Sequence, residues 1–257
     1  MKISASIYSS RDKQLEELAR ELDAYRIDLF HVDCNDDLGV FDDIRRLRAV
    51  SKTPIDLHVI SSDPEKFLAP IDELAIEYVT FQVESLTRPF ILPISNKTHF
   101  GISLVTETPV EAFKIFEDRA SFVLFMATTP GVSGQAFNKQ NFKKIRQFRS
   151  LYPDKKIHVD GGINAELSFI MRNMGVYSAV VGSYLLRQEF IGSALMQLHS
   201  DDIRSRFQVG DFMLTVDEIP VKRAAEFDCI KSLQIIEDYH MGFTNVVDEN
   251  HMLIGII

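Results

Sequence analysis

The stretch DLFHVDC, residues 28–34, sets His31 and Asp33 among the apolar residues of a short run, and runs rich in β-branched and aromatic residues recur along the chain. Short apolar runs of this composition are typical of buried β-strands. Segments with apolar residues at three- and four-residue steps, such as 13–25 and 137–152, lie between them and predict amphipathic helices. The predicted strands are KISASI (2–7), DLFHVDC (28–34), IDLHVI (55–60), YVTFQVE (78–84), FGISLV (100–105), FVLFMAT (122–128), KIHVDGG (156–162) and SAVVGSY (178–184).

The order of these elements predicts the fold. Strands that alternate with helices form a parallel sheet, and eight such units favour closure into a (β/α)8 TIM barrel. An open doubly wound sheet is the alternative, but no G-x-G-x-x-G motif follows the first strand. We predict an α/β protein with a barrel at residues 1–198. A connector and a small, incomplete α+β module are expected at residues 199–257.

Composition excludes several classes of protein. The 257 residues carry a formal net charge of −9 at pH 7 without a Lys/Arg-rich block, which argues against a nucleic-acid-binding protein. The chain has neither a signal-peptide pattern at its start nor an apolar run long enough to cross a membrane. Only two cysteines occur, Cys34 and Cys229, which suits a reducing compartment. We therefore expect a cytoplasmic protein.

Polar residues at the ends of the predicted strands indicate where the site lies. Active sites of TIM barrels form at the carboxyl ends of the strands. His31 and Asp33 end the second strand and share one face of it, while His58 lies in the third strand and Asp160 in the seventh. Two imidazoles and two carboxylates suit a divalent ion such as zinc, iron, manganese or cobalt. The sequence predicts one metal ion at the barrel mouth.

Glycine-rich turns follow the last three predicted strands. They are TTPGVSGQAF (128–137), DGG (160–162) and VGS (181–183). Glycines allow backbone N–H groups to approach an anion closely, and the loops after the last two strands often bind phosphate in this fold. A phosphorylated small molecule is therefore the expected substrate.

Taken in order, these motifs resemble the ribulose-phosphate 3-epimerase family over residues 1–190. The matching segments are SASIYS, HVD, DLHVISSDPEKFL, GISLVTETPVE, VLFMATTPGVSGQAF, VDGGIN and VVGS. The resemblance implies a metal-dependent isomerase that converts D-ribulose 5-phosphate to D-xylulose 5-phosphate, a pentose phosphate reaction, or epimerises a close analogue.

The resemblance also implies roles for individual residues. His31, Asp33, His58 and Asp160 would ligate the ion, and the two aspartates would also transfer protons through a metal-stabilised enediolate. Removing a proton from one face of C3 and returning one to the other requires two acid/base groups. The residues expected to contact the substrate are Ser6, His58, Met126, Gly134, Gln135, Gly161, Gly162, Gly182 and Ser183.

Several positions depart from the family pattern. Asn35 and Ile60 stand where the family has methionines that cap the site, Gln82 replaces a histidine, and Thr129 replaces a glutamate. These changes leave the substrate open, and a hexulose 6-phosphate is an alternative. A related aldol-type synthase or decarboxylase is disfavoured because such barrels carry a D-x-K-x-x-D segment that is absent here.

The C-terminal residues show a second resemblance. CIKSLQIIEDY (229–239) is expected to form a helix, and FTNVVDENHMLIGII (243–257) two strands joined by an acidic turn. Both segments resemble a CBS module, a regulatory repeat that binds adenine nucleotides or related ligands in pairs. The resemblance implies a nucleotide or sugar-nucleotide partner, or a role in packing alone, and relatives of the barrel commonly form homo-oligomers. It also raises a non-catalytic alternative, in which the barrel senses a sugar phosphate and the tail responds to nucleotides.

Overall fold

The computed structural model describes residues 1–10, 13–128, 135–215, 217–226, 228–239 and 241–257. The chain divides into two compact units, Met1–Arg206 and Phe207–Ile257. The first unit continues past residue 198 because Arg172 of the barrel donates hydrogen bonds to the carbonyl oxygen of Ser200 and to the carboxylate of Asp201. Among the described residues, no helix has the length and apolar character needed to cross a membrane.

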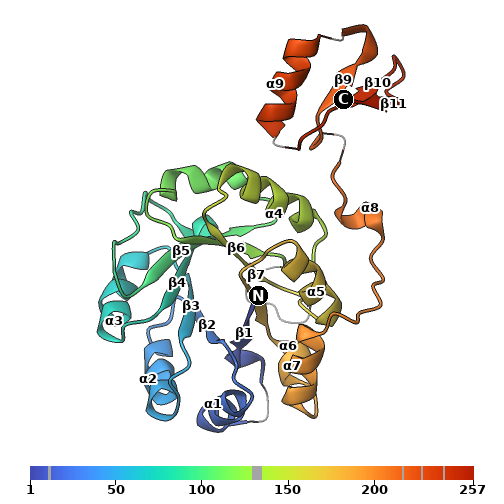
Figure 1. The fold of residues 1–257 in the computed structure, drawn as a ribbon. Coiled ribbons are helices and arrows are strands. Elements are labelled where there is room, and N and C mark those ends of the chain that lie inside the picture. The colour runs from blue at the N-terminus through green and yellow to red at the C-terminus, as the bar shows by residue number, and fades with distance from the viewer. Residues whose placement is uncertain (11–12, 129–134, 216, 227, 240) are drawn as a thin grey trace. The chain divides into compact units, whose positions relative to one another are not determined.

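The first unit is a closed barrel of eight parallel strands in sequential order, as predicted (Figure 1). The ring closes where β8 pairs with β1, from Lys2 opposite Ser178 to Ala5 opposite Val181. The strands are β1 (Lys2–Ser6), β2 (Leu29–Asn35), β3 (Ile55–Ile60), β4 (Tyr78–Gln82), β5 (His99–Val105), β6 (Phe122–Met126), β7 (Lys156–Asp160) and β8 (Ser178–Val181).

Helices cover the outside of the ring (Figure 1). The longer helices bury an apolar stripe, as α1 does with Leu18 and Leu22, because burying such a stripe stabilises the fold. The α-helices are α1 (Leu15–Ala24), α2 (Val40–Val50), α3 (Leu68–Glu73), α4 (Gln140–Leu151), α5 (Ala165–Asn173), α6 (Ser183–Leu186) and α7 (Ile191–His199). Short 3-10 helices are η1 (Ile7–Ser9) and η2 (Pro64–Phe67).

Strict alternation of strands and helices was the wrong expectation at two crossovers. After β4 the chain forms only the 3-10 turn η3 (Val83–Ser85), and after β5 only η4 (Val110–Phe116). Between η3 and β5 lie Pro89 and Pro93, which cannot donate the backbone hydrogen bonds of a helix interior. The barrel closes without these helices because the parallel ladders from β4 to β6 are complete.

The strand register sets the level of the inward-facing side chains. In the pairing of β2 with β3, His31 lies opposite Asp56, and Asp33 lies opposite His58. Successive inward residues are two apart, so Asp33 and His58 form one layer directly above His31 and Asp56. Asp160 ends β7. This register brings the polar ends of the second, third and seventh strands to the same mouth of the barrel.

An aromatic cluster joins α4 to the barrel wall. Phe148 of α4 is fully buried, with its ring centroid 4.8 Å from that of Phe113 in η4 and 5.6 Å from that of Phe125 in β6. Edge-on contacts of this kind add to the free energy gained by burying the rings. The cluster therefore anchors α4 against η4 and β6.

We expect Phe148→Ala to lower the free energy of unfolding by about 3–5 kcal/mol, because it removes a buried ring and leaves a cavity. Phe190→Ala is the matched control. The Phe190 side chain is 64% exposed, so its loss should change the free energy of unfolding by about 0.5 kcal/mol or less. Urea titration followed by circular dichroism measures both, and equal losses would show that the cluster does not anchor α4.

The second unit is a three-stranded sheet with one main helix. β9 (Val221–Arg223) pairs in parallel with β10 (Asn245–Val247), and β11 (Leu253–Ile256) pairs with β10 in antiparallel orientation. The helix predicted at CIKSLQIIEDY is α9 (Cys229–Tyr239). The remaining elements are α8 (Val209–Phe212) and η5 (Ala224–Glu226).

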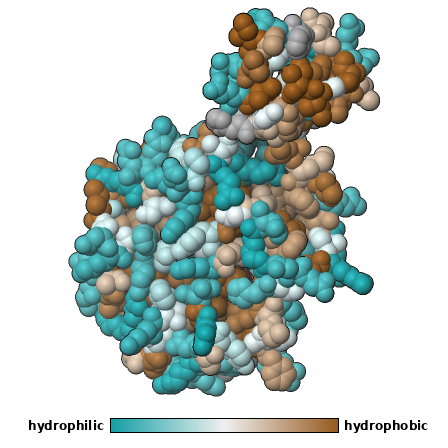
Figure 2. All heavy atoms as spheres, viewed as in Figure 1, coloured by the Kyte–Doolittle hydropathy of each residue, from teal (hydrophilic) through white to brown (hydrophobic). Residues whose placement is uncertain are grey.

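Hydrophobic side chains are prominent at the surface of this second unit (Figure 2). On β11, Leu253, Ile254 and Ile256 are each about 60% exposed, and Ile230 of α9 is 80% exposed.

The predicted helix and the two strands that follow it are confirmed. The CBS-like identity of the unit stays a prediction.

Candidate active site and metal centre

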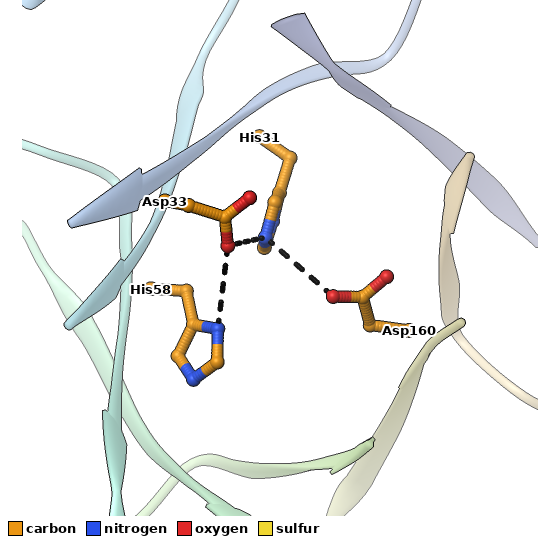
Figure 3. A group of neighbouring side chains, drawn as sticks. All are labelled: His31, Asp33, His58 and Asp160. Atoms are coloured by element: carbon orange, nitrogen blue, oxygen red, sulfur yellow. Dashed lines mark ion pairs between the residues drawn. The ribbon is translucent and has the colours of Figure 1, made fainter. Parts of the chain in front are cut away.

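Four of the residues predicted from the strand ends form one group at the barrel mouth. His31, Asp33, His58 and Asp160 each offer one nitrogen or oxygen atom, and these atoms all lie within 4.8 Å of one another. Figure 3 shows the four side chains from β2, β3 and β7 facing a common space. The imidazoles are buried, whereas the carboxylates of Asp33 and Asp160 are 25% and 20% exposed.

A buried carboxylate orients His31. The Nδ1 atom of His31 lies 3.0 Å from Oδ2 of Asp56, and Ser4 donates a hydrogen bond to the same oxygen at 2.8 Å. Because a carboxylate accepts hydrogen bonds, Nδ1 carries a proton and Nε2 faces the group of four. Nε2 lies 3.3 Å from Oδ1 of Asp33 and 3.9 Å from Oδ2 of Asp160.

The two imidazoles each direct an unpartnered nitrogen toward the carboxylates. Nε2 of His31 and Nδ1 of His58 are buried and form no hydrogen bond with any residue that the structure describes, and His58 Nδ1 lies 3.6 Å from Oδ1 of Asp33. Buried polar atoms without partners destabilise a fold, so an arrangement of this kind calls for a missing partner. A divalent cation would satisfy both nitrogens and both carboxylates, and mixed nitrogen and oxygen ligands suit zinc, iron, manganese or cobalt. The residues therefore fit a metal ion.

The two carboxylates differ in their electrostatic surroundings. Burial raises the pKa of Asp160 to about 6, and the nearby carboxylate of Asp33 adds to this effect. Burial also acts to raise the pKa of Asp33, but the imidazoles of His31 and His58 outweigh it and lower that pKa far below the usual range. Neighbouring carboxyl groups whose pKa values move in opposite directions are suited to act as a base and an acid.

A cavity of about 580 Å³ opens at this mouth. Asp33 and Asp160 line it, whereas His31 and His58 do not. Its volume suits a small ligand. Of the residues predicted to contact the substrate, those that line the cavity are Ser6, Met126, Gln135, Gly161, Gly162, Gly182 and Ser183. The predicted residue Gly134 lies outside the described residues.

The glycines after β7 are required by the backbone. Gly161 and Gly162 have φ angles of 116° and 70°, which side chains other than glycine rarely adopt. A Cβ atom on Gly161 would lie 2.8 Å from the backbone nitrogen of Thr128, and one on Gly162 would lie 2.5 Å from that of Phe137. Bare backbone therefore forms this side of the cavity.

Several residues of the site were not predicted. Asp56 could have been noticed, because it stands two residues before His58 and so puts an acidic group on the inward face of a buried strand. Tyr8, Tyr184 and Arg187 also line the cavity. Tyr8 donates a hydrogen bond to Asp43 at 2.9 Å. Tyr8 belongs to the matching segment SASIYS and Tyr184 to the predicted strand 178–184, but neither segment marks its tyrosine as a cavity residue. The 3-10 helix η1 and the helix α6 bring these two side chains to the mouth.

A family model described as the ribulose-phosphate 3-epimerase family matches residues 2–186. The chain belongs to the ribulose-phosphate 3-epimerase family. The match covers the barrel as far as α6, and the resemblance read from the sequence motifs is confirmed. Membership makes the protein an isomerase of the epimerase class. The segment from residue 187 to 257 lies outside the matched region.

Individual members of the epimerase family align over most of the barrel. The ribulose-phosphate 3-epimerase of Methanocaldococcus jannaschii is 28% identical over 215 residues, covering 77% of this chain and 89% of the relative. That of Bacillus subtilis is 24% identical over 212 residues, covering 77% of this chain and 98% of the relative.

Solved structures with the same fold are more distant in sequence. The 3-hexulose-6-phosphate synthase of Salmonella typhimurium superposes with a TM-score of 0.57 at 13% identity, over 77% of this chain and 96% of that one. A tryptophan synthase alpha-subunit from Pyrococcus furiosus gives 0.55 at 16% identity, with the same coverage. These likenesses show the TIM-barrel fold alone.

Proposed function

We propose that the protein is a metal-dependent 3-epimerase of a phosphorylated ketose, with D-ribulose 5-phosphate as the first substrate to test. The observation that carries the proposal is the pair of carboxylates, Asp33 and Asp160, which line one cavity beside two unpartnered imidazole nitrogens. Membership of the epimerase family supports the same reaction.

The two aspartates would move the protons. A C3 hydrogen next to a C2 carbonyl is acidic, so one carboxylate can remove it. The C–H electron pair then forms a double bond between C2 and C3, and the π pair of the carbonyl moves onto its oxygen. The other carboxyl group then donates a proton to the opposite face of C3, and the electron pair returns. Asp33 and Asp160 come from β2 and β7, which are not neighbours in the ring, so they can approach a substrate from two sides.

His31, Asp33, His58 and Asp160 would hold the metal ion. When bound, a divalent cation supplies a Lewis acid for the negative charge that develops on the oxygens at C2 and C3. Asp56 fixes the ring of His31 from behind, and the buried strands β2 and β3 fix the backbone of both histidines. The ligands are thus preorganised, which is how such sites favour the transition state over the bound substrate.

The lining of the cavity supports a phosphorylated sugar as the substrate and keeps a second sugar as an alternative to the pentulose. Gly161, Gly162, Gly182 and Ser183 would bind the phosphate through backbone N–H groups. Asn35 also lines the cavity and offers an amide that can hydrogen-bond to a sugar hydroxyl. A hexulose 6-phosphate is therefore the second substrate to test.

Metal-loaded protein incubated with D-ribulose 5-phosphate should produce D-xylulose 5-phosphate. Carbon NMR measures the conversion. Unphosphorylated D-ribulose is the control substrate. We expect its kcat/KM to be lower by at least about 10²-fold, because the loops after β6, β7 and β8 would lose their ligand. The proposal is wrong if neither ribulose 5-phosphate nor any hexulose 6-phosphate is epimerised.

For the C-terminal unit we propose a CBS-like regulatory role. The helix α9 and the strands β10 and β11 agree with the elements that suggested the resemblance, and β9 adds a third strand to them. A cavity of about 430 Å³ in this unit is lined by both charged and polar residues, among them Arg223, Asp248 and Asn250. Calorimetric titration of the whole chain with adenine nucleotides tests the proposal, and a homo-oligomer would be detected by light scattering in the same samples.

A further inference from the structure

We infer that Gln82 and Glu84 are positioning residues that hold His58 in a single tautomer, with the proton on Nε2 and a lone pair on Nδ1. This inference deepens the proposed metal centre and rests on it. Neither residue belongs to the group of four that would ligate the ion. They would act on the metal only through the imidazole of His58.

A buried network surrounds the far side of His58. Its Nε2 atom lies 3.0 Å from Oε1 of Gln82 at the end of β4, and 2.9 Å from Oγ of Ser103 in β5. Ser103 in turn donates a hydrogen bond to Oε1 of Gln82 at 2.8 Å. All three side chains are at most 2% exposed, so no bulk water competes for these contacts.

Glu84 fixes which end of the Gln82 amide faces His58. The amide nitrogen of Gln82 donates a hydrogen bond to Oε2 of Glu84. An ionised carboxylate only accepts hydrogen bonds, so the nitrogen of the amide must point toward Glu84 and its oxygen toward His58. The orientation of a glutamine amide is decided by such a network rather than by its shape.

Glu84 is itself held in place although it lies at the surface. Its Oε1 atom accepts hydrogen bonds from the backbone nitrogen of Val105, at 3.0 Å, and from the hydroxyl of Thr108. Val105 ends β5, so the carboxylate joins the ends of two neighbouring strands. Both oxygens of Glu84 thus have defined partners.

These contacts determine the tautomer of His58. The oxygen of Gln82 is an acceptor, and Ser103 uses its proton on Gln82, so both neighbours present lone pairs to Nε2. A neutral imidazole has one N–H and one lone pair. Nε2 must therefore carry the proton. The lone pair of His58 then lies on Nδ1, the atom that faces Asp33 and the other three residues of the group. This lone pair is what a metal ion requires.

The two histidines are oriented by different devices. His31 has the carboxylate of Asp56 as its direct partner, whereas His58 has a neutral amide with the carboxylate of Glu84 one step further away. The site already contains the carboxylates of Asp33, Asp56 and Asp160. Each further negative charge close to them disfavours ionisation of the others. A neutral amide orients the second imidazole without adding that charge.

The test compares metal affinity among variants. Cobalt(II) is titrated into chelator-treated protein in competition with a chromophoric chelator. Gln82→Leu, which keeps the size but removes both hydrogen bonds, should weaken cobalt binding about 10–100-fold. Glu84→Gln should also weaken cobalt binding, by a smaller factor. The new amide can both donate and accept a hydrogen bond, so it no longer forces the nitrogen of Gln82 to point toward residue 84. Glu107→Gln is the matched control, since Glu107 is exposed on the loop after β5 and has the same charge.

Nitrogen NMR of histidine-labelled, metal-free protein reads the tautomer directly, in mildly alkaline buffer where an ordinary imidazole is neutral. We expect the Nε2–H form of His58 in the parent and in Glu107→Gln, and a mixture of tautomers in Glu84→Gln. The inference is overturned if the parent shows the Nδ1–H form, or if Glu84→Gln changes neither tautomer nor affinity.

The NMR result does not depend on epimerase activity. A protein that shows the expected tautomer but binds no cobalt and epimerises nothing would contradict the proposed function while leaving the positioning role intact. Glu84 is exposed, so its variant also provides the test if Gln82→Leu fails to fold.

Discussion

Replacing Asp33 or Asp160 by asparagine is expected to slow epimerisation by about 10²–10⁴-fold, the usual contribution of a positioned acid or base. Asparagine keeps the shape of the side chain and one oxygen but cannot accept the C3 proton. Each variant would still possess the other carboxylate. Each remaining carboxylate would reach only one face of C3. Any remaining exchange of the C3 hydrogen with solvent should therefore occur with one epimer in the Asp33 variant and with the other epimer in the Asp160 variant.

Two further measurements and one control variant accompany these rates. Metal content distinguishes a lost proton carrier from a lost ligand. Binding of inorganic phosphate reports on the glycine loops, whose glycines neither substitution replaces, although Asp160 directly precedes Gly161. Asp72→Asn, on the exposed surface of α3, is the control and should retain the parent rate. A rate within tenfold of the parent in either site variant would contradict the two-carboxylate scheme.

Removal of divalent ions is expected to abolish turnover and to lower the melting temperature. The mouth of the barrel would then contain two imidazole lone pairs and two carboxylates without a cation between them. An ion present at 100 times its Kd stabilises the protein by about 2.7 kcal/mol, which corresponds to about 5–10 °C for a chain of this size. Adding back zinc, manganese, cobalt or iron(II) should restore both properties and rank the metals.

Histidine variants locate this effect. His58→Leu should lose most of the metal-dependent rise in melting temperature, whereas His199→Leu, at an exposed residue that ends α7, should keep it. An unchanged melting temperature and unchanged activity after chelation would show that the group of four holds no functional metal.

The barrel could be predicted from sequence because strand composition is a local property. The bounds of β3 are those read from IDLHVI. β7 ends at Asp160, two residues before its predicted end, because Gly161 and Gly162 adopt positive φ angles and leave the ladder. Among the described residues, no α-helix directly follows β4 or β5. Pro89 and Pro93 account for this after β4, and the count of eight units did not weigh them.

The site could be predicted to the extent that it follows from strand ends. His31, Asp33, His58 and Asp160 were grouped because barrel strands end at one mouth, and the structure brings them together. The orienting contacts made by Asp56 and Gln82 depend on the register between strands and on burial, neither of which one sequence gives. Gln82 stood out only as a departure from the family pattern.

Solvent exchange at C3 is the most direct measurement. D-ribulose 5-phosphate is incubated in deuterated water with metal-loaded protein and again after chelation, and proton NMR follows the C3 signal. We expect deuterium to enter C3 as xylulose 5-phosphate appears, and both changes to stop when the metal is removed. No exchange with this substrate or with hexulose 6-phosphates would contradict epimerase activity and favour a barrel that only binds its ligand.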